Sequence, residues 1–516
     1  MVALDFFECT TEGGYGMRRT AGLLALLLCL SLLCGCGKDA ENSQPESSAS
    51  VSSPAEDNTE GPQTFSLAYS RDDTLDPYAA ATEVNLGLAG LLYDSLTVIN
   101  DRFAPVNSLA SDIRQTDPTH WVAVLRSGVR FSDGSSVTAA DVTASFQRAK
   151  SSANYRVLLT NVAAASANAK TGEITFTLSS PDPNAAACFS FPILKSGTAT
   201  NAAGKAPLGG GLYAVTESDG GSTLTANPYS GRSSRYTTVP LRHLPNADTM
   251  FYGLASGNIT YYYDDLQSGT IPRVSGASAA VNMNALIYLG MNSGRPALAD
   301  VRVRQALSGL IDRKTLAASA CSGWALAATM PFHPVWSGVE KIEAPSGNRD
   351  LSGAVELLEQ AGFGTGGESQ TLSLELIYSN EGGSRAAAAE QIRTELEGAG
   401  IRVTVEPLSY SDYKNRLSAG NYDLYLGEVR LAANMSLDPL LTGAASFGIQ
   451  RDSAAAAAYN RYRVGEISLE EFIQTFNEDL PYIPLCWRCG FAAFDRRLST
   501  VTPHGYNPFY GMYQWK

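Results

Sequence analysis

Residues 372–408 read LSLELIYSNEGGSRAAAAEQIRTELEGAGIRVTVEPL. Along this stretch the sequence pattern changes from that of a strand to that of a helix and back to that of a strand. Apolar residues alternate with polar ones from Leu372 to Tyr378 and again from Ile401 to Glu406, which predicts two strands. Between them, Ser384 to Ala399 is rich in Ala and Glu and is followed by Gly400, so we expect a helix that ends there.

The same alternation continues along the chain. We expect a further helix around Tyr410 to Ala419 and a further strand from Asn421 to Gly427. Strand, helix, strand, helix, strand is typical of parallel strands joined by right-handed crossovers. The sequence therefore predicts an α/β lobe here.

An earlier stretch has a different order of elements. Trp121 to Arg126 alternates like a half-buried strand, and Ser132-Asp133-Gly134 is a turn signal. Thr138 and Asp141 have the spacing of a capping box, which predicts a helix that runs to about Ala149.

A third stretch predicts a short strand and two capped helices. Tyr288 to Met291 is apolar, and Asp300 and Asp312 each precede a helical pattern as candidate N-caps. For these acidic residues a scaffold role is the expectation, because capping already explains them.

The N-terminal region has the features of an export signal. Arg18 and Arg19 precede the apolar run Ala21 to Leu33, which is too short to span a membrane, so we interpret residues 17–35 as a signal peptide. Its exit resembles a bacterial lipobox and predicts lipidation at Cys36. An uncleaved anchor is the alternative interpretation.

The segments on either side of this signal have simpler compositions. Residues 1–16 contain nothing that a signal peptide needs, and we interpret them as a start-site extension ahead of Met17. Residues 36–62 are rich in Ser, Glu, Asn and Pro, so we expect a flexible tether. Beyond it, no other apolar run is long enough to span a bilayer.

The remaining chain, from about residue 63, is long enough for two or three lobes with their own cores. The hydrophobic content of the whole chain, 44%, is ordinary for a globular protein. The net charge of −13 argues against nucleic acid as a partner and against adhesion to anionic lipid.

Cysteine and histidine are sparse in this part of the chain. Only Cys188, Cys321, Cys486 and Cys489 follow Cys36, which is too few for a disulfide framework. The last two form Cys-Trp-Arg-Cys, for which a redox or metal role, a local disulfide and free thiols all remain open. We expect no metal site and no cofactor.

An enzyme would need a recognisable nucleophile, base or phosphate loop. The sequence contains no Gly-x-Ser-x-Gly elbow and no His-Glu-x-x-His motif. Gly209-Gly210-Gly211 lacks the Lys and Ser or Thr that a phosphate loop requires. The sequence therefore predicts a protein without enzymatic activity.

Several motifs, in order, resemble the bacterial extracellular solute-binding protein family 5, which contains the oligopeptide-, dipeptide- and nickel-binding components of ABC importers. They extend over about residues 65–515. The motifs are LLYDSL, FAPVNSLASDI, LRSGVRFSDGSSVTAADVTASF, PLGGGLYAV, NPYSG, LGMNSGRPALADVRVRQALSGLIDR, AVELLEQAGF, GIRVTVEPL and GNYDLYLG.

The resemblance implies an α/β fold of the periplasmic-binding-protein type II, with two lobes, a hinge and an interlobe cleft that closes on ligand. Its three domains correspond to the cluster C type. Domain I would comprise residues 63–96, 205–284 and 477–516, domain II the insert 97–204, and domain III residues 285–476.

The loop after the expected strand at 422–427 is the first candidate for ligand contact. Peptide-binding relatives place an Asp there that holds the peptide amino terminus, but this chain has Met435 at that position. The loop instead contains Glu428, Arg430 and Asn434. Glu428 and Arg430 would hold an amine and a carboxylate, or pair with each other.

Two further segments supply candidate ligand residues. Tyr78 and Glu83 occupy positions that line the cleft in relatives, and Tyr263 ends three consecutive tyrosines that cannot all face a core. Trp487 and Arg488 are weaker candidates, because core packing explains the tryptophan.

The resemblance implies a lipid-anchored receptor that delivers a peptide or peptide-like solute to an ABC permease and its ATPase. We expect a monomer that contacts the membrane only through its lipid, at the extracellular face of the cell membrane or in the periplasm. The alternatives are a surface sensor of the same fold and an importer receptor for a non-peptide ligand such as a nickel chelate.

Overall fold

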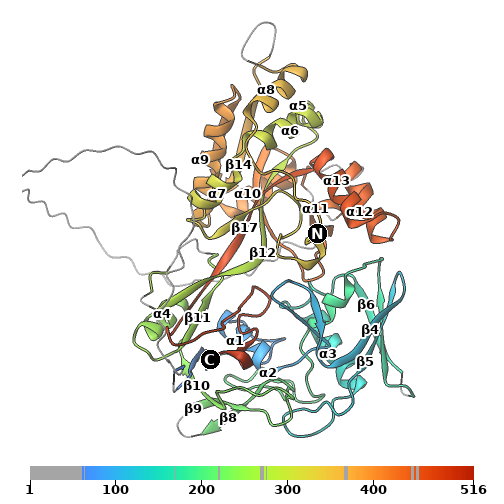
Figure 1. Cartoon of the computed structure of the whole chain (residues 1–516), viewed down its shortest axis with the longest axis vertical. Helices are drawn as coiled ribbons and strands as arrows, with labels where there is room; N and C mark the ends of the chain where they lie inside the picture. Colours follow the sequence, from blue (N-terminus) through green and yellow to red (C-terminus); the bar gives the residue numbers. More distant parts are fainter. Residues whose placement is uncertain are drawn as a thin grey trace, which may run out of the picture. The chain divides into compact units, whose positions relative to one another are not determined.

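The computed structural model describes residues 61–516 except 63, 169, 219–220, 268–271, 275, 365–369, 443–446 and 449–452. All of them fall within the unit Glu60–Lys516, which is drawn as ribbons in Figure 1. The expected start extension, signal peptide and lipidated Cys36, and the expected tether up to residue 60, lie outside the described residues.

The largest sheet has seven strands, in the order β11-β17-β12-β16-β14-β15, with β13 paired to β17. The strands are β11 (Tyr261–Asp264), β12 (Ala277–Met291), β13 (Ala325–Ala327), β14 (Ser373–Ser379), β15 (Arg402–Leu408), β16 (Leu424–Arg430) and β17 (Tyr482–Phe494). β14 is parallel to both β15 and β16, which confirms the predicted parallel pairing. β12 is antiparallel to β16 and β17.

Helices cover both faces of this sheet (Figure 1). They are α5 (Pro296–Ala299), α6 (Val301–Leu310), α7 (Arg313–Ser319), α8 (Leu351–Gln360), α9 (Gly383–Glu397), α10 (Tyr410–Ala419), α11 (Asp438–Leu441), α12 (Ala454–Arg463) and α13 (Leu469–Asp479). On β12, Ile287 and Leu289 pack in one core with α6 and α9, whereas Leu286 and Tyr288 pack in another with α10 and α13. Burial on both faces explains why this strand is almost continuously apolar.

The predicted boundaries agree closely with these elements where the local signals are strong. The helix expected at 384–399 is α9, and its end is followed by Gly400, whose φ is 84°. Asp300 and Asp312 cap α6 and α7 by accepting backbone N–H groups, as expected.

Two smaller sheets and a hairpin form the other part of the structure. The first sheet contains β1 (Leu67–Tyr69), β10 (Thr238–His243), β9 (Gly221–Ala226) and β8 (Tyr213–Ser218). The second contains β4 (Ala110–Asp117), β5 (His120–Leu125), β7 (Glu173–Leu178) and β6 (Val162–Ala167), and β2 (Thr97–Ile99) pairs with β3 (Pro105–Asn107). The accompanying helices are α1 (Glu83–Gly87), α2 (Ala89–Leu92), α3 (Ala139–Ser151) and α4 (Ala247–Ala255). The predicted capping box of α3 is present at Thr138 and Asp141.

We call the part that contains β1–β11 and the C-terminal residues the first lobe, and the part that contains β13–β16 and α5–α13 the second lobe. The strands β12 and β17 run through both lobes and pair with each other from Ala277 to Gly290 (Figure 1). The pairing shifts register between Asn282 and Ala285, close to the passage from one lobe to the other. These two strands therefore connect the lobes.

The four cysteines in the described residues are free. Cys486 and Cys489 both lie on the extended strand β17, and the Sγ of Cys486 is 4.0 Å from the Sγ of Cys321, which follows α7. The thiol contact in the structure is thus Cys321 with Cys486, two residues that are far apart in sequence.

Treatment with the thiol oxidant diamide tests this placement. We expect a single disulfide between Cys321 and Cys486, because their sulfur atoms are already in contact at 4.0 Å. Peptide mapping with mass spectrometry identifies the linked pair. A Cys486–Cys489 bond would contradict the strand geometry, and the Cys489→Ser variant serves as the control that keeps the expected link.

Candidate functional site

A network of charged side chains lies where β16 and β17 flank β12. Glu428, on β16, accepts hydrogen bonds from Arg488 Nε on β17 (2.9 Å) and from Arg385 Nη2 on α9 (3.2 Å). The side chain of Arg488 is 9% exposed and that of Glu428 is 21% exposed. Glu428 therefore pairs with Arg488 and Arg385 rather than with Arg430.

The buried Arg488 has one further partner. Its Nη1 donates to the backbone carbonyl of Asp265, which follows β11. Burial alone lowers the pKa of Arg488, but the negative charges of Glu428 and Asp265 outweigh this effect and raise it. A charged guanidinium at this depth depends on such partners, because an uncompensated buried charge is costly.

Arg430 is solvent-exposed at the end of β16. Its Nη2 donates to the backbone carbonyl of Gly505, in the C-terminal segment of the first lobe. The two residues Glu428 and Arg430, which the sequence places on one side of a strand, therefore have different roles: Glu428 compensates a buried charge and Arg430 remains accessible.

Glu83 lies at the start of α1, in the first lobe, and faces the same network. Although its side chain is solvent-exposed, partial withdrawal from water and then the negative charges of Asp265 and Asp264 raise its pKa to about 7. Arg430 and Arg488 act in the opposite direction. These effects place Glu83 and Arg430 in one electrostatic environment.

Tyr263 contributes an aromatic ring to this environment from β11. Its hydroxyl lies 3.2 Å from the Sδ of Met283, and burial raises its pKa while Arg430 opposes the shift. Its neighbours Tyr261 and Tyr262 are buried, whereas Tyr263 is half-buried. Tyr261 and Tyr263 pack against one core cluster and Tyr262 lies in another, so both faces of β11 are covered and the expectation that the three tyrosines cannot all face a core is wrong.

The structure does not bring Tyr78 into this group. Tyr78 is buried, its hydroxyl donates to the backbone carbonyl of Pro192, and its ring packs against Tyr155 and Arg148. Burial raises its pKa well above the usual value. The ligand contact predicted for Tyr78 stays a prediction, and the hydroxyl has a partner within the first lobe.

Asn434 joins the two lobes instead. It is buried, and its Nδ2 donates to Asp182 Oδ2 over 2.7 Å, from the loop after β16 to a loop of the first lobe. Burial raises the pKa of Asp182, an effect that the hydrogen bond from Asn434 opposes.

Arg463, at the end of α12, extends this contact between the lobes. Its guanidinium donates to the Pro181 carbonyl (2.9 Å) and to Ser180 Oγ (2.6 Å) and pairs with Asp438 in its own lobe (2.9 Å). Asn434 and Arg463 therefore hold the same loop of the first lobe.

Local sequence patterns contain no signal for several of these partners. Arg385 and Asp182 lie in segments whose local patterns indicate only a helix start and a loop. Their pairing with Glu428 and Asn434 joins positions that are separated by 43 and 252 residues. Only the folded chain brings them together.

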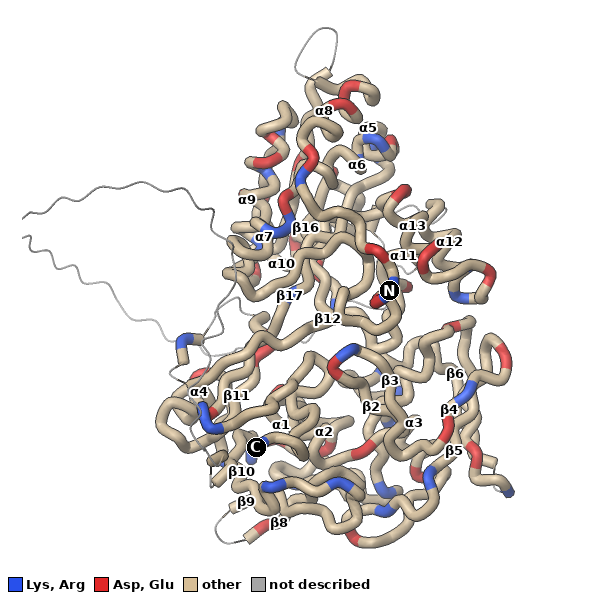
Figure 2. The backbone as a smooth tube through the Cα atoms, viewed as in Figure 1, with Lys and Arg blue, Asp and Glu red and all other residues tan. Residues whose placement is uncertain are grey.

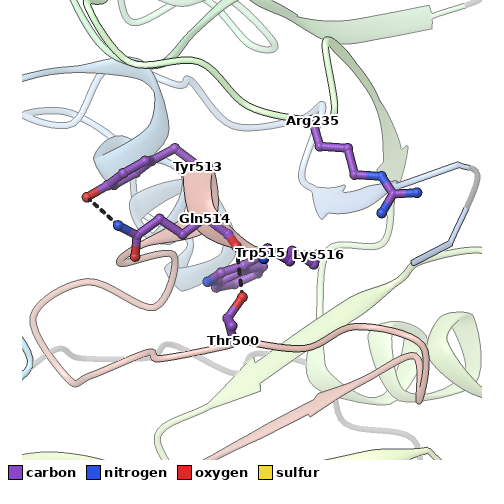
Figure 3. Close-up of a pocket in the computed structure, with 6 residues that line it drawn as sticks. All are labelled: Arg235, Thr500, Tyr513, Gln514, Trp515 and Lys516. Atoms are coloured by element: carbon purple, nitrogen blue, oxygen red, sulfur yellow. Dashed lines mark hydrogen bonds between the residues drawn. The ribbon is translucent and has the colours of Figure 1, made fainter. Parts of the chain in front are cut away.

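An open hollow of about 790 Å³ lies elsewhere on the first lobe (Figure 3). It is lined by Arg235, Thr500, Tyr513, Gln514, Trp515 and Lys516. Thr500 Oγ1 donates to the Gln514 carbonyl over 2.8 Å, and Trp515 is buried. The hollow thus results from how the C-terminal turn packs, and it contains none of the predicted site residues.

Charge is distributed over both lobes. Figure 2 shows Lys and Arg interspersed with Asp and Glu on the first and the second lobe alike. Within the described part of the chain, three or more His, Cys, Asp or Glu side chains never gather in a group that would hold a metal ion. Likewise, none of the described helices has the length and apolar character needed to cross a membrane.

Replacement of Glu428 by Gln tests the buried ion pair. The change leaves Arg488 without its charged partner, and we expect the free energy of unfolding to fall by about 2 kcal/mol, less than the roughly 3–5 kcal/mol known for fully buried pairs. Urea denaturation provides the measurement.

The matched control is Glu466→Gln. Glu466 pairs with Arg461 at the surface, where the two side chains are 61% and 58% exposed. We expect a loss of at most about 1 kcal/mol. Equal losses for the two variants would contradict the role assigned to Glu428.

Known proteins share this fold. The chain is 25% identical over 451 residues to the oligopeptide-binding protein AppA of Bacillus subtilis (strain 168), and the match covers 79% of each protein. The unliganded open form of the periplasmic murein tripeptide binding protein MppA has a TM-score of 0.73 at 17% identity, covering 87% of this chain and 96% of that one.

A nickel ABC transporter structure from Bacillus halodurans is similarly close, with a TM-score of 0.72 at 19% identity and coverage of 87% and 98%. These likenesses confirm the expected α/β fold of the cluster C periplasmic binding proteins. Residues 104–444 match the family described as bacterial extracellular solute-binding proteins, family 5 Middle. The chain therefore belongs to this solute-binding, non-enzymatic family, the substrate-binding components of ABC transporters.

Proposed function

We propose that this protein is the receptor of an ABC importer and that it binds a peptide or peptide-like solute between its two lobes. The observation that carries the proposal is the placement of Glu83 and Arg430. They are an acidic and a basic side chain, both solvent-exposed and on different lobes, and Arg430 acts to lower the pKa of Glu83, which is about 7.

This pair is suited to a zwitterionic ligand. A carboxylate on one lobe and a guanidinium on the other complement the amine and the carboxylate of a short peptide, and charged hydrogen bonds are the stronger kind. Binding to both lobes at once would favour their closure, because a ligand shifts a conformational equilibrium by its differential contacts.

The buried ion pair of Arg488 and Glu428 is consistent with this assignment. Glu428 is paired with Arg488, so Arg430 on β16 contacts the Gly505 carbonyl instead of a carboxylate. The peptide named for AppA and the tripeptide named for MppA agree with such a ligand. Because one of the similar structures is a nickel transporter, a non-peptide ligand is the second candidate.

We further propose that Cys36 carries a lipid and that residues 36–62 tether the receptor beside its permease and ATPase. The polar composition of this segment supports a loose linker, which raises the local concentration of the receptor at the importer. A monomer suffices for this role. A surface sensor would use the same ligand site with a different membrane partner.

Native mass spectrometry of residues 63–516, purified from its host after growth in rich medium, tests the ligand class. Mild denaturation then releases what is bound, and we expect a series of short peptides. A single non-peptide mass or a nickel chelate would contradict the peptide proposal, and a protein that is empty and ignores added peptide pools would contradict a receptor function.

The Arg430→Gln variant tests the residue assignment in the same experiment. Loss of a charged hydrogen bond weakens binding by about tenfold or more, so the fraction of protein with bound peptide should fall accordingly. The matched control is Arg461→Gln, which removes an exposed arginine on α12 and should leave occupancy unchanged. Equal occupancy in the two variants would contradict the role of Arg430.

A further inference from the structure

Phe103 lies at the tip of the β2–β3 hairpin of the first lobe and is completely buried. Its ring centroid is 5.0 Å from that of His333, in the second lobe, and 5.3 Å from that of Tyr506. Its φ of 53° lies in the left-handed region, which a bulky side chain rarely adopts. Contacts with both lobes thus hold a strained residue in place.

The hairpin tip is fixed to the second lobe by few polar contacts. The Ser337 amide donates to the Arg102 carbonyl over 3.0 Å. Arg102 pairs with Glu340 over 2.7 Å, but these side chains are 48% and 54% exposed, so the pair contributes little. The tip is therefore able to withdraw without loss of a buried ion pair.

His333, beside the Phe103 ring, is a buried hydrogen-bond donor without an acceptor. Its Nδ1 accepts from the Val335 amide over 3.1 Å, and burial lowers its pKa to about 3, so the neutral ring carries its proton on Nε2. Among the described residues, that Nε2 has no hydrogen-bond partner.

Trp487 supplies a second such donor. Its ring centroid is 5.1 Å from that of His333, it is completely buried, and its Nε1 has no acceptor within the described part of the chain. Buried polar groups in proteins are nearly always paired, so two adjacent unpaired donors require an explanation.

Asn284, on β12, presents an unpaired acceptor and is hydrogen-bonded to Tyr506. Its Nδ2 donates to the Tyr506 hydroxyl (2.6 Å) and lies 3.4 Å from the Leu431 carbonyl, which identifies the amide orientation. Its Oδ1 is left without a donor among the residues described. His333 and Tyr506, which contact the Phe103 ring, thus connect it to the unpaired groups of Trp487 and Asn284.

We propose that Phe103 is a displaceable stopper in a ligand subsite, in which Trp487 and His333 donate to a carbonyl oxygen and Asn284 accepts from an N–H group. The ligand class is a molecule with an amide group next to an apolar or aromatic group, such as an internal residue of a peptide. This inference rests on the proposed function and adds a subsite to it.

The Phe103→Ala variant opens the space, and two probes distinguish its chemistry. N-acetylphenylalaninamide carries a phenyl ring and two amide groups, whereas toluene carries the ring alone. We expect the amide probe to bind about tenfold more tightly, since two otherwise unpaired donors gain an acceptor. Titrations followed by the ¹⁵N–¹H resonance of the Trp487 indole measure both affinities, and the amide probe should move that resonance downfield.

The Phe103→Ala/Trp487→Phe variant is the matched control, in which the preference for the amide probe should fall. Phe103→Leu retains apolar bulk and provides a second folded variant, which we expect to bind both probes more weakly than Phe103→Ala. Equal affinity for toluene and the amide probe, or no binding of either, would overturn the subsite.

The wild-type protein separates this inference from the proposed function. Peptides that bind it without changing the Trp487 indole resonance would overturn the subsite and leave the receptor function standing. A preference of Phe103→Ala for the amide probe, in a protein that releases no peptides in native mass spectrometry, would support the subsite and contradict the peptide as its natural ligand.

Discussion

The pairing of β12 with β17 is the constraint on which the rest of the structure depends. These strands are 15 and 13 residues long, they pair almost throughout, and they alone among the described strands pass through both lobes. Arg488 and Trp487 lie on β17, Asn284 lies on β12, and Glu428 lies on β16 beside β12. These four polar groups are therefore placed relative to this pair of strands. A change in the angle between the lobes would move the contacts of Phe103, Asn434 and Arg463, while the groups on these strands kept their mutual geometry.

The charged residues of the site fall into two groups: those that form buried ion pairs and those that are exposed to solvent. Arg488 is buried and is compensated by Glu428 and the Asp265 carbonyl, so this part of the network stabilises the fold. Glu83 and Arg430 remain exposed, one on each lobe. The interlobe contacts at Asp182 use an amide and a guanidinium that donate to oxygen atoms of one loop. Hydrogen bonds that involve a charged group are the stronger kind, so these contacts stabilise the arrangement of the lobes seen in the structure.

Local sequence patterns predicted the elements of the second lobe well, because β14, α9, β15 and α10 each satisfy a strong period and end at a clear stop signal. The same reasoning placed Glu428 and Arg430 on one side of a strand. It did not identify the partner of Glu428, because Arg488 is 60 residues away and its burial depends on the packing of β17. Nor did it single out Phe103, whose surroundings come from both lobes and from the C-terminal segment. Strands and helices are recognised because their apolar residues recur with periods of 2 and 3.6 residues. A site between lobes depends instead on contacts between residues that are far apart in sequence, and these contacts follow no such period.

The central claim is that the lobes separate about β12 and β17 while these strands stay paired. Native-state hydrogen exchange of the Ser337 amide tests it most directly, because that N–H donates to the Arg102 carbonyl across the lobes. We predict exchange at least about tenfold faster than for the paired amides of β12 and β17, since opening of the lobes costs less free energy than global unfolding. Exchange of Ser337 at the same rate as the β12–β17 amides would contradict the account, because the lobes would then separate only when the whole protein unfolds.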